Sequence, residues 1–182
     1  MPAEILVTVD DREIRTKLNT MRILLRNLGP FYRNVGEEMV SETRHVIFPA
    51  QRDPATGTPW PKLKGSTVWG KARSKRSFTG ARRILRRSGM LQDTIRYQAD
   101  GSGVRWGTDR IYGPIHYFGG KTKPHVIKPR NKKALSWPGA AHPFKSVRHP
   151  GSKIPSRRFL GVGPRQRTRI LEIAEDYLRR AA

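Results

Sequence analysis

The chain has 182 residues, a length that fits one folded domain (1–182), and its 36% hydrophobic content excludes a disordered tail or a collagen. It carries 37 Lys and Arg against 14 Asp and Glu, a formal net charge of +23 that a partner is expected to neutralise. The lack of cysteine excludes a disulfide scaffold and a sulfur zinc site, and the lack of an apolar run of ~18 residues or a signal-peptide start predicts a soluble protein made in the cytoplasm, with no membrane partner.

The N-terminal quarter predicts one strand and one long helix. Residues 5–9 are rich in β-branched side chains, as in a strand. Over residues 11–48, apolar side chains recur every three or four positions, which is the period of a buried helical face. Asp10 is placed to cap this helix, and Gly29-Pro30 to kink or break it. We interpret the apolar stripe as core, and its first part is Ile14, Leu18, Met21, Leu25 and Leu28.

Residues 49–88 predict an extended basic arm. Turn-forming glycines and prolines punctuate this segment, and its apolar residues are scattered. A stretch of this length without regular structure is uncommon inside a domain and is usually functional or mobile. Within the arm, residues 82–87 predict a short helix, because Ile84 and Leu85 lie among four arginines before Ser88-Gly89.

The second half predicts an antiparallel sheet. Tightly connected strands are expected over residues 94–99, 103–108 and 111–118. A basic loop region over residues 121–158 lies within the sheet and offers further short strands at 125–127 and 134–137.

A final helix is expected over residues 164–180, with Arg179 and Arg180 at the negative end of its dipole. The order of elements predicts an α+β fold. In this fold the antiparallel sheet is packed by the long N-terminal helix and by the C-terminal helix, and long basic loops extend from it.

The basic residues gather in two windows. Residues 54–92 hold ten basic side chains and residues 110–171 hold fifteen, with no carboxylate in either window. The rest of the chain has 12 basic and 14 acidic residues, so a near-neutral scaffold displays two cationic segments. Such segments can neutralise nucleic-acid phosphates, meet an acidic protein surface in an assembly, or form a solvated face. Composition alone does not separate these three interpretations.

The residue types that catalysis needs are sparse. Two-metal phosphoryl transfer requires several carboxylates around one cavity, and the cationic windows contain none, which disfavours a nuclease. None of the five histidines has the spacing of a zinc-binding helix. His116 lies among aromatic residues and fits a hydrogen-bonded core or interface histidine better than a catalytic base. We therefore expect no enzymatic activity, no metal and no cofactor.

Trp60 and Trp69 lie in or beside basic sequence, a mixture that is also typical of proteins that bind single-stranded nucleic acid. Trp60 lies between Pro59 and Pro61. A rigid aromatic residue flanked by prolines loses little entropy on docking, so we expect Trp60 to anchor the arm against a neighbouring surface.

Four short stretches carry a pattern that extends over nearly the whole chain. They are DPATGTPW at 53–60, SGMLQDTI at 88–95, GTDRIYGPIHYFGG at 107–120 and IPSRRFLG at 154–161. In this order they resemble the virion morphogenesis (tail completion) proteins of tailed phages, including those of Mu-like prophages. The resemblance implies a neck protein, assembled in the host cytoplasm, that finishes the tail or joins it to the head in the virion. Similar neck proteins form rings, often hexamers, around the DNA channel.

Under this resemblance, the expected partners are further copies of the chain, the tail tube and the connector or stopper proteins on the head side, with non-specific contact to DNA in the channel. The candidates for subunit or partner interfaces are Trp60, Lys62, Lys64, Trp69, Arg82, Arg83, His116, Arg157 and Phe159. The candidates for contact with DNA or an acidic partner are Lys121, Lys123, Arg130, Lys132, Lys133, Lys145 and Arg148. The alternative is a free nucleic-acid-binding protein that uses the basic arms, for which affinity falls steeply as salt rises.

Overall fold

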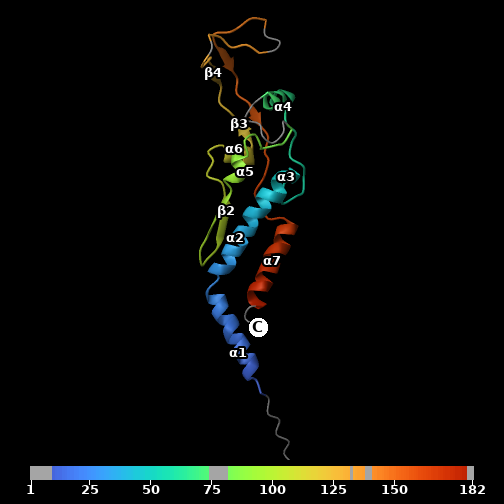
Figure 1. Ribbon diagram of the computed structural model, residues 1–182, viewed down its shortest axis with the longest axis vertical. Coiled ribbons are helices and arrows are strands. Elements are labelled where there is room, and N and C mark those ends of the chain that lie inside the picture. The colour runs from blue at the N-terminus through green and yellow to red at the C-terminus, as the bar shows by residue number, and fades with distance from the viewer. Residues whose placement is uncertain (1–9, 74–81, 132, 138–140, 180–182) are drawn as a thin grey trace, which may run out of the picture.

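The computed structural model describes residues 10–73, 82–131, 133–137 and 141–179. The molecule is elongated, with helix α1 (Arg12–Arg26) projecting at one end and strand β4 (His125–Ile127) with its loops at the other (Figure 1). The strand expected over residues 5–9 lies outside the described residues. The α+β class is confirmed, with small antiparallel sheets instead of one continuous sheet.

The long N-terminal helix is broken where the sequence predicts. Helix α1 ends at Arg26, and α2 (Gly29–Glu42) begins with Pro30 in its first turn, where the missing N–H of a proline costs nothing. Helix α2 continues through a π-helical turn, η1 (Thr43–Ile47), into α3 (Phe48–Ala50).

The prediction that the whole apolar stripe is core is wrong for α1. No residue of α1 is buried, and Leu18 is 60% exposed, whereas Val35 and Met39 of α2 are buried. The reason is geometric, because α1 extends past the end of α2 and α7 (Pro164–Arg179) and projects alone (Figure 1).

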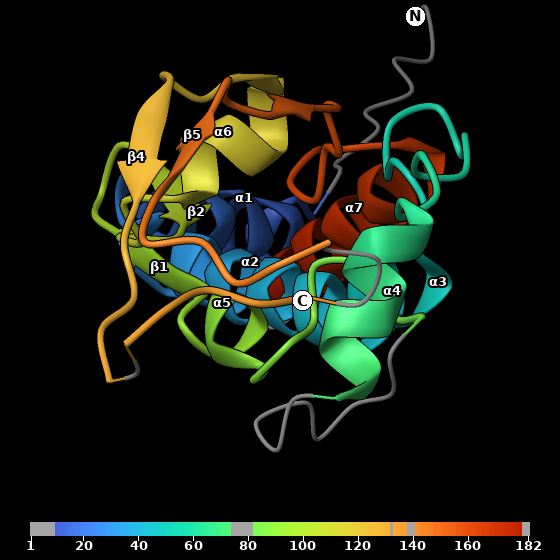
Figure 2. The same ribbon diagram turned by 90° about the horizontal axis from the view of Figure 1, so that it is seen from above.

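Helix α2 lies between a β-hairpin and α7 (Figures 1 and 2). Strands β1 (Arg96–Ala99) and β2 (Val104–Gly107) form the expected antiparallel hairpin, with Tyr97 opposite Trp106. Helix α7 confirms the closing helix. Glu42 of α2 is buried and pairs with Arg165 of α7 at 3.0 Å.

The third expected strand, over residues 111–118, is wrong, because Gly113–Phe118 forms helix α6. Pro114 occupies the first turn of this helix. Gly119 ends the helix with a left-handed φ of 78°, and a Cβ there would lie 2.7 Å from the backbone nitrogen of Ser156.

Two further strand pairs join segments that are far apart in sequence. Strand β3 (Gly120–Lys121) pairs with β6 (Lys153–Ile154), and β4 pairs with β5 (Val147–His149), both antiparallel. The strand expected at 134–137 is reduced to a single bridge between Leu135 and Phe144.

Most of the described part of the arm lacks regular structure, but Gly65–Ala72 forms helix α4. The short helix expected over residues 82–87 is wrong, since these residues form turns that bury Ile84. Helix α5 (Met90–Asp93) follows the arm.

The main core cluster lies near α3, about midway along the molecule in Figure 1, and includes Trp60 in the first part of the arm. The ring of Phe48 contacts Trp60 edge-on at a centroid distance of 5.9 Å and Phe159 at 5.7 Å. The indole Nε1 of Trp60 donates a hydrogen bond of 2.8 Å to the carbonyl of Arg158. The core therefore fixes the start of the arm and the segment after β6 against the end of the long helix.

Candidate partner-binding site

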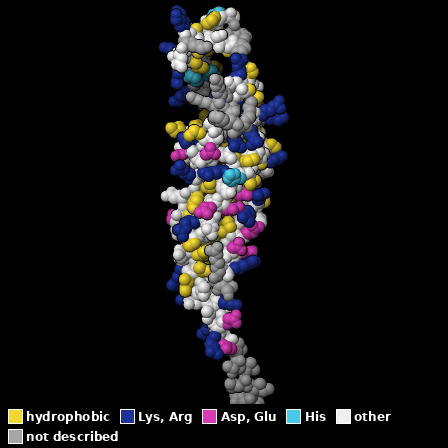
Figure 3. Space-filling model, in the orientation of Figure 1, with side chains coloured by type: hydrophobic (Ala, Val, Ile, Leu, Met, Phe, Trp, Pro, Cys, Tyr) yellow, Lys and Arg dark blue, Asp and Glu magenta, His cyan; other side chains and the backbone are white. Residues whose placement is uncertain are grey.

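One end of the molecule is built from the two carboxylate-free windows. Helix α4, helix α6 and strands β3 to β6 all lie in these windows, and in Figure 1 they occupy the half of the molecule opposite α1. Figure 3 shows Lys and Arg side chains at this end, and a mixture of Asp, Glu, Lys and Arg side chains over the rest of the face in view. We call the half formed by these elements the cationic end.

The predicted contacts for DNA or an acidic partner lie on exposed parts of the cationic end. Lys121 lies in β3 and Arg148 in β5. All the candidates that the structure describes are exposed, namely Lys121, Lys123, Arg130, Lys133, Lys145 and Arg148. Lys132 lies outside the described residues.

The predicted interface residues divide into exposed and buried groups. The exposed group is Lys62, Lys64, Trp69, Arg82 and Arg83. The guanidinium of Arg73 lies over the Trp69 ring, 4.7 Å from its centroid. Trp60 and Phe159 are buried in the core of this same chain.

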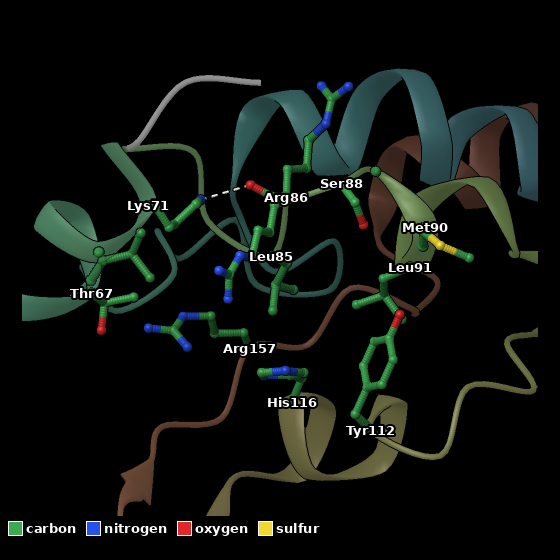
Figure 4. Close-up of a pocket in the computed structure, with 14 residues that line it drawn as sticks. Thr67, Lys71, Leu85, Arg86, Ser88, Met90, Leu91, Tyr112, His116 and Arg157 are labelled. Atoms are coloured by element: carbon green, nitrogen blue, oxygen red, sulfur yellow. Dashed lines mark hydrogen bonds between the residues drawn. The ribbon is translucent and has the colours of Figure 1, made fainter. Parts of the chain in front are cut away.

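A cavity of about 520 Å³ lies under the arm (Figure 4). It brings together α4, the turns after residue 82, helix α6 and the segment after β6. Its cationic and titratable lining is Lys71, Arg86, Arg87, His116 and Arg157, and its large apolar lining is Leu63, Leu85, Met90 and Leu91. None of the described residues that line it is acidic. We call it the cationic pocket.

Lys71 of α4 fixes one wall of this pocket. Its Nζ donates hydrogen bonds to the carbonyls of Arg83 at 2.5 Å and Arg86 at 2.7 Å, and Figure 4 shows the second of these. These bonds hold the turns after residue 82 against α4. Burial, and secondly the charge of Arg87, lower the pKa of Lys71.

Arg157 and His116 form the opposite wall. The Arg157 guanidinium donates to the carbonyl of Pro61 from Nε at 3.1 Å and Nη2 at 2.9 Å, and burial lowers its pKa. The Arg157 backbone N–H donates to the carbonyl of His116 at 2.9 Å. Burial, and secondly the charge of Arg157, lower the pKa of His116, so its imidazole is mainly neutral at pH 7.

The pocket offers cations and a neutral imidazole to a ligand, which is chemistry for holding an anion. Within the described ranges, no three His, Asp or Glu side chains form a group that could hold a metal. No described helix is long and apolar enough to cross a membrane.

Sequence reasoning selected His116 and Arg157, which the fold brings together across 41 positions. It did not select Lys71, Arg86 or Arg87, although all three lie in the first cationic window. Lys71 lies on helix α4, and a prediction of this short helix would have pointed to Lys71 as a residue with a fixed position. Because the sequence predicts an irregular arm here, it does not single out Lys71.

The chain is an elongated α+β molecule with one cationic end, and a partly open pocket lies within that end. The model of the phage virion morphogenesis family matches residues 9–179, and the chain belongs to this family. A structural or assembly role in phage particles follows from this membership. Comparisons with curated proteins and with solved structures gave no match.

Proposed function

We propose that this chain is a structural neck protein, a tail terminator or tail completion protein. In this role it forms a ring, a hexamer, at the top of the tail and joins the tail to the head around the DNA channel. The observation that carries the proposal is the cationic end, since a family member of this shape offers one basic end and one near-neutral end to different partners. The subunit acts by binding and makes or breaks no covalent bond.

Self-association is supported by an exposed apolar helix face and by an acidic groove on the same chain. Helix α1 presents an exposed apolar stripe. Three of its five basic residues pair with carboxylates in or just before the helix, which leaves Arg22 and Arg26 to face the carboxylates of another copy. A groove of about 310 Å³ between α2 and α7 is lined by the carboxylates of Glu37, Glu38 and Asp176, with Ile173 and Tyr177 as its apolar part. Head-to-tail contacts of unlike surfaces form rings when the rotation between neighbouring copies closes on itself. In the proposed ring, α1 of one subunit lies against the α2–α7 groove of the next.

The cationic end faces the other partners. These are the tail tube and the connector or stopper proteins on the head side, and phosphates of DNA in the channel make non-specific contacts. The protein is assembled in the host cytoplasm and stays in the neck of the virion.

The second candidate function is free nucleic-acid binding. One observation favours it, because Trp137 and Phe144 stack at 5.2 Å in the basic loop that follows β4. Aromatic platforms among cations are typical of proteins that bind single strands. This candidate predicts tight binding of DNA or RNA by the isolated chain, with an affinity that falls steeply as salt rises.

The test is complementation of a phage that lacks this gene product, with negative-stain imaging of the particles. We expect separate heads and tails without the protein, and joined particles when the wild-type chain is supplied. The double variant Lys145→Glu and Arg148→Glu at the cationic end should fail to join heads to tails. The matched control, Arg96→Glu and Arg105→Glu on the exposed face of the β1–β2 hairpin, should restore joining. Normal joined particles without any copy of the chain would refute the neck role.

A further inference from the structure

Two cations are buried in the cationic pocket, and no carboxylate of the described residues pairs with either of them. Lys71 is 7% exposed and Arg157 is 6% exposed. Their charged groups bond to backbone carbonyls, and in the described ranges neither residue makes an ion pair. Buried charges in proteins are generally paired, because an uncompensated buried ion is costly. The backbone carbonyls that accept these hydrogen bonds offset part of this cost, but they carry no net charge and so do not neutralise Lys71 or Arg157.

The surroundings of these two cations add positive charge. Arg86 and Arg87 line the same pocket, and the charge of Arg87 already disfavours the protonated form of Lys71. The Nδ1 atom of His116 is buried in the pocket wall, and no described residue offers it a hydrogen bond. Lys71, His116 and Arg157 come from three separate segments and converge on one cavity, and none of its described lining residues is acidic.

We propose that the cationic pocket is a receptor for a carboxylate side chain, glutamate or aspartate, of a protein partner in the virion. The proposal rests on the proposed function, in which this chain binds other virion proteins. It assigns one of those contacts to named residues.

The walls of the pocket favour a protein carboxylate over a nucleic-acid phosphate. Leu63, Leu85, Met90 and Leu91 supply an apolar lining, which suits the aliphatic stem of an acidic residue and an apolar neighbour. A cavity of about 520 Å³ accepts one or two side chains. A phosphate in a nucleic-acid strand carries sugars on both sides, and these hydrated groups would have to lie against the same apolar walls.

The first experiment measures binding of small probes to the full chain by NMR, with the His116 imidazole and the backbone amides as reporters. The probes are acetyl-Leu-Glu-Ala-amide, its Gln counterpart acetyl-Leu-Gln-Ala-amide, and inorganic phosphate. We expect the Glu peptide to shift the His116 signals and to raise the pKa of His116. The Gln peptide and phosphate should have much smaller effects. Phosphate binding as tight as that of the Glu peptide, or no binding of the Glu peptide, would overturn the proposal.

Lys71→Met and Lys64→Met form a matched pair for this measurement. Both substitutions remove one positive charge from α4 or its N-cap and keep an unbranched side chain, but only Lys71 lines the pocket. Lys71→Met should weaken binding of the Glu peptide by about tenfold, since a hydrogen bond to a charged group is lost. Equal weakening by Lys64→Met would count against the pocket.

A gain of charge provides a test that does not depend on the folding of Lys71→Met. Thr67 is exposed on α4 and lines the pocket, so Thr67→Glu supplies a carboxylate from the chain itself. Thr67→Glu should melt at a higher temperature than Thr67→Gln and should no longer bind the Glu peptide. Equal melting temperatures together with retained peptide binding would refute the receptor.

Failure of the receptor and failure of the neck role give different results. If heads and tails separate without the protein but the Glu peptide does not bind, the neck role stands and the receptor falls. If the Glu peptide binds as expected but particles join normally without the protein, the pocket stands and the neck role falls.

Discussion

Two buried charged side chains, Glu42 and Arg157, connect segments that are more than 90 positions apart. Glu42 accepts hydrogen bonds from Arg165 and from the amide of Gln166, which ties α2 to the start of α7. Arg157 is paired differently, since it donates to the carbonyl of Pro61 on the arm. Glu42 therefore has a cationic partner, whereas Arg157 keeps its full charge at the pocket wall.

The lowered pKa of His116 predicts a loss of stability in acid. In the unfolded chain an imidazole has a pKa near ~6.5, so the unfolded state takes up the proton first as the pH falls. The stabilisation from a neutral His116 is present above about pH 6.5 and is lost below it. The groups that line the pocket with His116 do not offset this, because Lys71, Arg86, Arg87 and Arg157 are basic residues and none of the described lining residues is a carboxylic acid.

We therefore expect His116→Asn to lose less stability than the wild type between pH 7.5 and pH 5.5 in urea unfolding. His142→Asn, at an exposed loop position, is the control and should follow the wild type. A His116→Asn variant with the same pH dependence as the wild type would contradict the assignment.

At the scale of elements, the sequence predicted correctly those helices and turns whose position depends on neighbouring residues. Pro30 and the 3.6-residue period gave the break between α1 and α2 and the position of α7, and the turn residues after Asp100 gave the β1–β2 hairpin. The strand expected at 111–118 is wrong because the six residues Gly113–Phe118 are too few to distinguish the period of a helix from that of a strand. Pro114 in the first turn and Gly119 after the last residue favour the helix. The pairings of β3 with β6 and of β4 with β5 depend on long-range packing, which no local pattern records.

The contact between α2 and β1 depends on one glycine. A Cβ on Gly36 would lie 2.2 Å from Cδ2 of Tyr97, whose hydroxyl donates to Glu37 at 3.1 Å. Overpacking at Gly36→Ala costs about 1–3 kcal/mol and the gain in helix propensity offsets ~1 kcal/mol of it, so we expect a net destabilisation of up to about 2 kcal/mol.

The measurement for Gly36→Ala is the midpoint of urea unfolding. Gly101→Ala is the matched control, because the space around a Cβ at that hairpin position is open and its φ is not left-handed. If Gly36→Ala and Gly101→Ala unfold at the same urea concentration, the hairpin can shift on α2 without loss of stability.

At the scale of the whole molecule, the sequence predicted that two segments are purely cationic, because the positions of Asp and Glu along the chain can be counted without a structure. It did not predict that the two basic windows meet at one end of the molecule, since this follows from long-range contacts such as those of Trp60 with Arg158 and of Arg157 with Pro61. The same limit applies to the cationic pocket, where His116 and Arg157 were expected at an interface but their convergence with Lys71 depends on how the arm folds back.

The exposed stripe of α1 gives the prediction that depends on the assembled molecule. An isolated helix of 15 residues is marginal in water, and the stripe that includes Ile14, Leu18 and Leu25 has nothing over it in the described part of the chain. In the proposed ring, the α2–α7 groove of a neighbouring copy covers this stripe. Leu18→Glu removes a leucine side chain whose full burial would contribute about 1.5–3 kcal/mol, and it brings a carboxylate towards an acidic groove. Association should therefore weaken by roughly tenfold or more.

Sedimentation of the purified chain checks this expectation. The wild type should sediment as a ring, and its association should weaken at high salt, because opposite charges face each other across the contact. Leu18→Glu should sediment mainly as a monomer with an unchanged circular dichroism spectrum. Asn19→Glu adds the same charge on the polar face of α1 and should still form rings. If Leu18→Glu assembles as well as Asn19→Glu does, the stripe of α1 is not the contact that closes the ring.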